Sequence, residues 1–391
     1  MKSGFRILHS LRAPVGGLFR HVCDLATAQS RAGHEVAVVC ADTGDALTRA
    51  RLDALAAKVS LGVHRIAMGR DVGFADARAT RHAYDLAKAL AVDVVHGHGA
   101  KGGAYARLAS RALRMRGPVP LCFYTPHGGS LHLGATSMKG RAHKAIERRL
   151  EDMTDGLIFE SAFSAKCYAN LVGQPRTLSR VIPNGVGPAD FEPVRLNDDA
   201  TDLLFIGELR HLKGVDVLLE ALALVQTRRP MSLTIVGSGP DGDAFRAQAD
   251  ARGLLHCVRF VGAHPARDAF KMGHMLIAPS RAESFPYILL EAGALARPLI
   301  TTNVGGIAEI IGDSGSPMLE PGNVDALATA LFAHLAAPDA SSHHASALQA
   351  RVAKLFTIET MATAVNDFYA ATAAQRAQTM AQRPRRILRS S

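Results

Sequence analysis

Short apolar runs rich in β-branched residues alternate along the whole chain with longer segments whose apolar positions recur at helical spacing. The first half predicts strands at 5–10, 35–40, 64–68, 92–96, 119–124, 156–160 and 178–183, and helices that include 18–32, 76–91 and 100–116. The second half repeats the pattern, with strands at 202–207, 232–237, 258–262, 275–279, 298–302 and 317–319, and helices that include 214–226, 241–252, 287–296 and 324–336. An Ala-rich helical stretch follows at 341–380.

This alternation is typical of parallel sheets that are covered by helices on both faces. Two such arrays predict an α/β protein with two Rossmann-like domains, at residues 1–185 and 186–365, whose parallel sheets face a central cleft. A linker rich in Pro, Gly, Asp and Asn spans 184–202. Residues 366–391 are expected to form a C-terminal helix and a basic tail.

Composition narrows the class of protein. Of the 391 residues, 48% are hydrophobic and 20% are charged, as in soluble globular proteins. No apolar run is long enough for a membrane-spanning helix, and the start lacks a signal-peptide pattern, so we expect a cytoplasmic protein. The five cysteines form no CxxC pair, which argues against a zinc ribbon or a redox dithiol.

The net charge of +10 is concentrated in residues 1–185, which contain 26 Lys and Arg against 14 Asp and Glu. Two helical segments supply basic residues. Lys101, Arg107, Arg111, Arg114 and Arg116 occur with no acid among them, and Arg107, Arg111 and Arg114 have the spacing of one helical face, as do Arg141, Lys144 and Arg148 in the second segment. These faces are either solvated or attracted to an anionic surface or acceptor. No series of aromatic residues alternates with the charges to stack on bases, so we expect no nucleic-acid partner.

Candidate chemistry in the first half follows predicted strands. Gly16 and Gly17 lie between a strand and a helix, where a turn and a phosphate site are both consistent with the pattern. His127 follows the strand at 119–124 and is expected to face the cleft. His96 and His98 resemble a metal pair, but with no third ligand apparent we favour strand-end packing or polar contacts and expect no metal.

In the second half, Arg210 and Lys213 lie in a loop that begins at Gly207, directly after the first strand. Two cations at this place could hold a diphosphate. The glycines at 237–242 match GxGxxG, but the next strand has no acid for a ribose, so we interpret them as a turn.

The densest pattern is the segment 279–292, in which Glu283 and Glu291 are eight residues apart around a helix start. Two carboxylates so placed can accept hydrogen bonds from sugar and ribose hydroxyls. The structural alternative is a buried pair of acids with partners elsewhere in the core.

Taken together, the motifs resemble the retaining GT-B glycosyltransferases of family 4, also called glycosyl transferases group 1, over about residues 5–370. Glu283 and Glu291 match the E-x7-E element of that family, in order with Gly16-Gly17, Pro126-His127-Gly128, residues 182–186, Gly207 to Gly214, residues 236–240 and residues 303–309. Two positions depart from the family pattern, with Glu208 where Arg often follows the glycine, and Pro286 where the E-x7-E loop usually has glycine.

The resemblance implies an acceptor-side domain at 1–185 and a donor-side domain at 186–365. It implies catalytic roles for His127, Arg210, Lys213 and Glu283, and a donor site made of Gly16, Gly17, Gly207, Arg210, Lys213, Glu283, Ser284, Phe285 and Glu291. Neither a cofactor nor a metal is required by this resemblance.

The implied reaction moves a sugar, with retention, from a nucleotide-diphosphate donor to a saccharide or lipid-linked saccharide acceptor in cell-surface polysaccharide or glycolipid synthesis. The implied place is the cytoplasm, with peripheral docking on the inner face of the cell membrane as a hypothesis. Two alternatives stay open: a GT-B epimerase of sugar nucleotides, and a non-catalytic GT-B protein that binds a sugar nucleotide.

Overall fold

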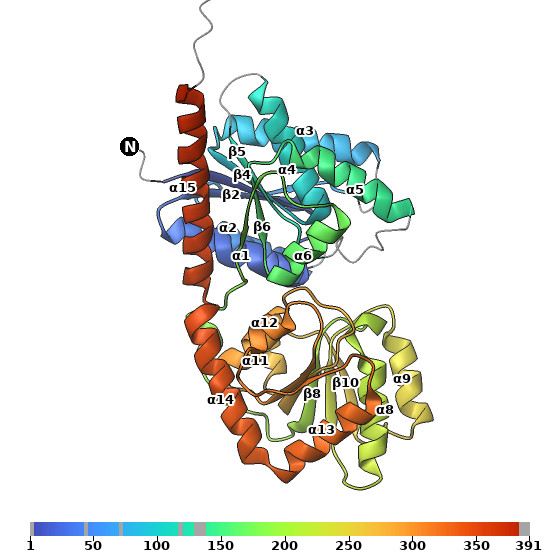
Figure 1. The fold of residues 1–391 in the computed structure, drawn as a ribbon. Helices are drawn as coiled ribbons and strands as arrows, with labels where there is room; N and C mark the ends of the chain where they lie inside the picture. The colour runs from blue at the N-terminus through green and yellow to red at the C-terminus, as the bar shows by residue number, and fades with distance from the viewer. Residues whose placement is uncertain (1–3, 43–45, 70–72, 116–119, 129–137, 383–391) are drawn as a thin grey trace, which may run out of the picture. The chain divides into compact units, whose positions relative to one another are not determined.

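The computed structural model describes residues 4–42, 46–69, 73–115, 120–128 and 138–382. Arg116 and the predicted basic tail at 383–391 lie outside the described residues. The chain divides into two compact units, and each contains one wholly parallel sheet (Figure 1). Unit 1 comprises Met1–Pro183 and Ile358–Ser391, and unit 2 comprises Asn184–Thr357. The predicted pair of Rossmann-like α/β domains is confirmed.

Unit 1 has a seven-stranded sheet in the order β3-β2-β1-β4-β5-β6-β7. Its strands are β1 (Arg6–Leu11), β2 (Glu35–Ala41), β3 (Val63–Ile66), β4 (Val94–His98), β5 (Leu121–Thr125), β6 (Gly156–Phe159) and β7 (Leu178–Val181). Its helices are α1 (Gly16–Arg31), α2 (Ala46–Ala56), α3 (Phe74–Ala89), α4 (Gly99–Arg114), α5 (Met138–Glu151), α6 (Ala162–Leu171) and α15 (Ile358–Gln382). The order of strands reverses between β1 and β4, which makes that junction the topological switch point of the sheet.

Unit 2 has a six-stranded sheet in the order β10-β9-β8-β11-β12-β13. Its strands are β8 (Thr201–Ile206), β9 (Leu233–Val236), β10 (Val258–Gly262), β11 (Gly273–Ala278), β12 (Leu299–Thr302) and β13 (Met318–Leu319). Its helices are α7 (Pro188–Phe191), the 3-10 turn η1 (His211–Lys213), α8 (Val215–Gln226), α9 (Gly242–Ala251), α10 (Ala266–Ala269), α11 (Tyr287–Ala294), α12 (Ile307–Ile311), α13 (Val324–Ala336) and α14 (Pro338–Leu355). The switch point of this sheet lies between β8 and β11.

The C-terminal helix differs from the sequence-based division of the chain. The helical stretch at 341–380 is two helices, and the second, α15, belongs to unit 1 rather than to a domain at 186–365 or to a separate tail. Met361, Val365, Phe368 and Tyr369 are buried in the core of unit 1, and α15 packs against α1 and β5 (Figure 1). Burial of this apolar face holds the end of the chain against the first sheet.

The predicted linker at 184–202 is also part of a folded unit. Asn184 is buried and donates a hydrogen bond from Nδ2 to the Phe285 carbonyl at 3.1 Å. Val186 forms a bridge with Thr357, the last residue of unit 2. The Pro- and Gly-rich composition reflects the short helix α7 and its turns, so the segment is folded against unit 2.

The prediction that Arg107, Arg111 and Arg114 share one free basic face is wrong for two of the three. Arg107 is fully buried, and Arg114 forms an ion pair with Asp155, so only Arg111 is exposed. In the other predicted face, Arg148 pairs with the buried Glu151. Arg114 is therefore paired with an acid distant in sequence, and Arg148 with an acid one turn along the same helix. Among the described residues, no helix combines the length and the apolar character that crossing a membrane requires.

Candidate active site

The first candidate site lies at the switch point of unit 1. Gly16 and Gly17 form the exposed first residues of α1, in the loop after β1, as the sequence predicts. Gly16 has a φ of +63°, which favours glycine, and a Cβ at this position would meet no atom within 4 Å. The turn requires glycine for its backbone, and the open space leaves the free N–H groups of the helix accessible to an anion.

Five histidines gather beside this turn. His9 comes from β1, His21 from α1, His96 and His98 from β4, and His127 from the loop after β5. The first four are buried, whereas His127 is partly exposed. The register of the sheet explains the cluster, because His9 is paired with His96 across neighbouring strands. Sequence reasoning treated His127 and the pair at 96 and 98 separately and missed the contributions of β1 and α1.

Hydrogen bonds link most of these rings. His9 Nδ1 lies 3.0 Å from His98 Nε2, and His98 Nδ1 lies 3.0 Å from His127 Nε2. His96 bonds to Thr125 Oγ1 through Nε2 at 2.8 Å and to the Tyr369 hydroxyl through Nδ1 at 2.7 Å. Burial lowers the pKa of His9 to about 4 and that of His127 to about 3. Burial also lowers the pKa values of His96 and His98, so these four rings are neutral at pH 7.

The cluster also provides the third ring that the sequence did not reveal. Nitrogen atoms of His9, His96 and His98 lie within 4.8 Å of one another, and so do those of His21, His98 and His127. A group of three imidazoles can bind a transition metal. However, both ring nitrogens of His9, His96 and His98 already have hydrogen-bond partners. In this first group the geometry therefore favours the predicted polar contacts.

The second candidate site lies at the switch point of unit 2, where Lys213 and Glu283 meet. Lys213 ends η1 after β8, and Glu283 lies in the loop between β11 and α11. Lys213 Nζ donates to Glu283 Oε1 at 2.6 Å, and Ser280 Oγ donates to the same oxygen at 2.8 Å. The Glu283 side chain is only 12% exposed and that of Lys213 is 29% exposed. A cation and a carboxylate are thus held together at the carboxyl end of the sheet, where ligands bind in such folds.

Two glycines allow the backbone to position this pair. Gly214 has a φ of +72°, and a Cβ there would lie 2.0 Å from the Pro279 carbonyl oxygen. Gly305 has a φ of +63°, and its Cβ would lie 1.9 Å from the carbonyl oxygen of Glu283. Both contacts are too short for any side chain. The loops after β8, β11 and β12 can therefore pack this closely only because glycine occupies these two positions.

We expect Gly305→Ala to displace the Glu283 loop, because the added methyl group meets both a backbone oxygen and a positive φ. The expected loss in the free energy of unfolding of unit 2 is about 1–3 kcal/mol, measured by urea denaturation. Gly322→Ala is the matched control, since Gly322 also has a positive φ but has open space around its Cβ. Equal losses in the two variants would show that strain alone, and not the contact with Glu283, accounts for the effect.

Arg210 is more exposed than Lys213. Its guanidinium lies 3.7 Å from the carboxylate of Glu208, and both side chains are about half exposed. The structure thus pairs the shifted arginine with the glutamate that departs from the family pattern. Arg281, which the sequence analysis did not single out, forms two hydrogen bonds with Asp216 and one with the His211 carbonyl. These bonds fix the η1 turn that presents Lys213.

The remaining predicted residues lie around α11. Glu291 is on that helix and is 7% exposed. The Phe285 ring is in the core of unit 2, packed edge-on against Phe356, so any contact with a donor would come from its backbone. The Ser284 carbonyl accepts a hydrogen bond from Gly306 N at 2.7 Å. Pro286 is the N-cap residue of α11, one position before the N1 place that suits proline best.

The GxGxxG segment at 237–242 supports the neighbouring loop, in agreement with its interpretation as a turn. The Asp241 carboxylate accepts from His211 N at 2.7 Å, and Leu209 N donates to the Ser238 carbonyl at 3.0 Å. Gly207 N likewise donates to the Val236 carbonyl at 3.0 Å. The segment thus holds the loop that carries Arg210 and Lys213.

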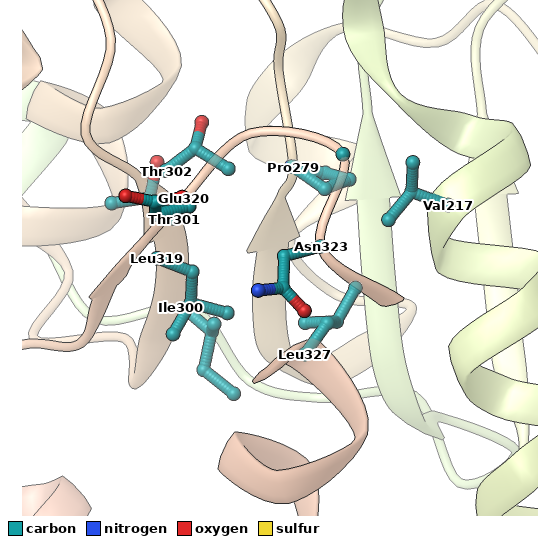
Figure 2. A pocket seen from close by; sticks show the side chains of 10 residues that line it. Val217, Pro279, Ile300, Thr301, Thr302, Leu319, Glu320, Asn323 and Leu327 are labelled. Carbon is teal, nitrogen blue, oxygen red and sulfur yellow. The ribbon is translucent and has the colours of Figure 1, made fainter. Parts of the chain in front are cut away.

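A small pocket lies near the same edge of the second sheet (Figure 2). Its lining includes Pro279 after β11, Thr302 at the end of β12 and Glu320 after β13. A water-sized sphere has about 10 Å³ in which to move, which is room for about one water. The Asn323 side chain at its wall accepts from Ala326 N at 2.9 Å and caps α13. This pocket is too small for a nucleotide, so it is a packing defect beside the site.

Two protein families match the chain. The family described as Glycosyltransferase Family 4 matches residues 15–190, and the family described as Glycosyl transferases group 1 matches residues 200–336. The first match covers Gly16, Gly17 and His127, and the second covers the residues from Gly207 to Glu291.

Among curated proteins, the chain is similar to a glycogen synthase of Mycobacterium tuberculosis. The two are 30% identical over 386 residues, which cover 91% of each chain. It is also similar to a D-inositol 3-phosphate glycosyltransferase of Kribbella flavida, with 28% identity over 332 residues that cover 74% of this chain and 77% of the relative.

Solved structures show the same fold at low identity. Sucrose-phosphate synthase of Thermosynechococcus elongatus aligns with a TM-score of 0.78 at 20% identity, over 96% of this chain and all of the other. Anabaena HepE in complex with UDP and glucose aligns with a TM-score of 0.77 at 18% identity, over 94% of this chain and all of that chain. These likenesses support the GT-B fold class.

Proposed function

Since this chain belongs to the glycosyltransferases of family 4 and group 1, we propose that it transfers a sugar from a nucleotide-diphosphate donor with retention of configuration. The observation that carries the proposal is the Lys213–Glu283 pair at the switch point of unit 2. The structural neighbour HepE, whose solved complexes contain UDP and UDP-glucose, supports a nucleotide-sugar donor.

Unit 2 binds the donor in this proposal. Lys213 and Arg210 hold the diphosphate, because charge-assisted hydrogen bonds to phosphate are strong. Glu283 accepts hydrogen bonds from hydroxyls of the donor sugar, and Glu291 accepts from the ribose. Backbone groups of Gly207, Ser284 and Phe285 complete the set.

Unit 1 carries the other residues of the proposal at the carboxyl edge of its own sheet. His127 accepts a hydrogen bond from a sugar hydroxyl, and the N–H groups at Gly16 and Gly17 contact an anionic group of the donor or of the acceptor. The acceptor is a saccharide or a lipid-linked saccharide.

Chain residues stabilise the leaving diphosphate electrostatically. As the bond between the anomeric carbon and the diphosphate oxygen breaks, negative charge grows on that oxygen, and the Lys213 ammonium stabilises it. Because Ser280 and Glu283 already orient the ammonium, little reorganisation is needed when charge develops. In this proposal the side chains supply the stabilising charge, and the step requires no metal.

Nucleotide binding to wild type and to Glu291→Ala tests the proposal. In thermal-shift and calorimetry measurements with UDP, GDP, ADP and their sugars, one diphosphate should stabilise the wild type by about 2.7 kcal/mol at 100 times its Kd. The same ligand should not stabilise Glu291→Ala. Glu220→Gln is the control, because Glu220 lies in the same unit and pairs with Arg252 at the surface.

Product analysis then separates the alternatives. Sugar on an added saccharide or lipid-linked acceptor supports the transferase. A changed sugar nucleotide that forms with no acceptor present indicates the epimerase. Nucleotide binding with no turnover on any acceptor indicates the non-catalytic protein, and absence of binding by every nucleotide contradicts the proposal.

A further inference from the structure

A chain of hydrogen bonds runs through the histidine cluster of unit 1, from the C-terminal helix to the loop after β5. Gln29 Nε2 donates to Asn366 Oδ1 on α15 at 3.0 Å, and Gln29 Oε1 lies 2.7 Å from His9 Nε2. His9 then contacts His98, and His98 contacts His127, each at 3.0 Å. The three residues in the middle of this series, Gln29, His9 and His98, are all buried.

The amide of Gln29 gives this chain a direction. Its nitrogen is committed to Asn366, so its oxygen faces His9, and an oxygen can only accept. His9 therefore carries its proton on Nε2 and accepts at Nδ1. A neutral imidazole has one N–H, so His98 must donate from Nε2 and accept at Nδ1. His127 is then the donor at Nε2, which leaves Nδ1 as its acceptor.

We propose that Gln29, His9 and His98 are positioning residues that hold His127 in the Nε2–H tautomer, so that its Nδ1 serves as an acceptor toward a substrate hydroxyl. The role toward substrate rests on the proposed function, whereas the tautomer rests on the hydrogen bonds alone. A ring held in this way accepts from a sugar hydroxyl and offers no proton to a phosphate oxygen. His127 is thereby selective for hydroxyl groups.

The backbone conformation of His127 agrees with a ring that is fixed by its hydrogen bond to His98. His127 has a φ of +53°, in the left-handed region that side-chain-bearing residues seldom adopt. Such a conformation is unfavourable and persists where the surroundings fix it. The bond to His98 is one such constraint. Burial also lowers the pKa values of His9, His98 and His127, which keeps the rings neutral as the relay requires.

The end of this series of hydrogen bonds that is distant from His127, which we call the far end of the relay, depends on residues of the C-terminal helix α15. Asn366 orients the Gln29 amide, and Tyr369 on the same helix bonds to His96, whose ring lies 4.0 Å from that of His98. Helix α15 thus determines which atoms donate and which accept in the hydrogen-bond network that ends at the candidate site. Removal of the oxygen of Gln29 would leave the N–H of His9 without its acceptor. The donors and acceptors along the series of hydrogen bonds from His9 to His127 would then no longer be fixed.

Nitrogen-15 NMR of the histidine-labelled full chain reads the tautomers directly. At pH 7 we expect His9, His98 and His127 to be neutral with the proton on Nε2, with signals assigned from the single variants His9→Asn, His98→Asn and His127→Asn. An Nδ1–H tautomer at His127, a protonated ring or an averaged mixture would overturn the proposal. Zinc added to one equivalent should leave these signals unchanged, and its binding to the rings would replace the relay by a metal site.

Two variants of Gln29 then test the link to catalysis. Gln29→Glu keeps an acceptor for His9 and should preserve the Nε2–H tautomer of His127, whereas Gln29→Leu should give a mixture. We expect Gln29→Leu to lower kcat by roughly 10- to 100-fold with the KM for the donor within about twofold. Gln29→Glu should recover most of that loss. Equal kcat values in the two variants, with different tautomers, would refute the positioning role.

Failure of the relay and failure of the proposed function give different results. NMR needs no substrate, so the expected tautomers in a protein that turns over no donor would contradict only the function. Donor turnover with the opposite tautomer would contradict only the relay. If Gln29→Leu fails to fold, Asn366→Ala supplies the second variant. It removes the acceptor that orients the Gln29 amide, and Asn366 is partly exposed on α15.

Discussion

Replacement of Lys213 by alanine is expected to lower kcat for sugar transfer by about 100- to 1,000-fold. The ammonium lies at the switch point of unit 2, held at 2.6 Å from Glu283 and partly shielded from water. In the proposed function, its removal takes away the charge that stabilises the leaving diphosphate. It also leaves the mostly buried Glu283 carboxylate with Ser280 as its remaining donor, which repels an incoming phosphate.

Transfer of radiolabelled sugar to the acceptor, under saturating donor, measures this effect. Lys271→Ala is the matched control, because Lys271 lies in unit 2 and its partner Asp268 is half exposed. The control should keep kcat within about twofold, since exposed ion pairs contribute little. A Lys213→Ala enzyme with wild-type kcat and a raised KM would show that the lysine binds donor and transition state equally, which contradicts the assigned role.

Replacement of Arg107 by methionine is expected to lower the free energy of unfolding of unit 1 by about 3–5 kcal/mol. Arg107 is fully buried and donates from Nη1 to Glu147 at 2.8 Å and from Nη2 at 3.2 Å. Its guanidinium also lies 3.8 Å from the centre of the Tyr124 ring. Without the arginine, the Glu147 carboxylate remains buried with no compensating charge.

Differential scanning calorimetry should show this as a fall in the Tm of the unit 1 transition. The double variant Arg107→Met with Glu147→Leu should recover most of the loss, because no charge then remains buried. Arg111→Met on the exposed side of the same helix should change the Tm little. A double variant as unstable as Arg107→Met would show that stacking on Tyr124, and not the ion pair, dominates.

Local pattern was enough to predict the strands but not their partners. Each predicted strand is present, with ends that shift by a few residues, because a buried parallel strand leaves a continuous apolar run in the sequence. Helices α2, α6 and α12 were not predicted. Side-chain partners follow from tertiary contacts, so the spacing of Arg107 with Arg111 suggested a free face where burial against Glu147 decides otherwise.

The residues of the candidate sites likewise fall into those that the local sequence could predict and those that depend on tertiary contacts. Lys213, Glu283 and Glu291 follow strands or begin helices in a recognisable order, and the structure brings the first two together. The histidine cluster needed the strand order, because His9 and His96 become neighbours only when β4 pairs with β1 rather than with β3. Nothing local indicated that Asn366 and Tyr369, far along the chain, would complete that cluster.

The return of α15 to unit 1 has a consequence for biosynthesis. A ribosome that has released the first 183 residues has not yet supplied Phe368 and Tyr369, so the nascent unit exposes the apolar groove that they fill. Unit 2 is contiguous and can complete its core during translation, whereas unit 1 must wait until α15 has been made. A premature stop codon after α14 would thus leave a ready substrate for chaperones and proteases, although every residue of unit 2 had been made.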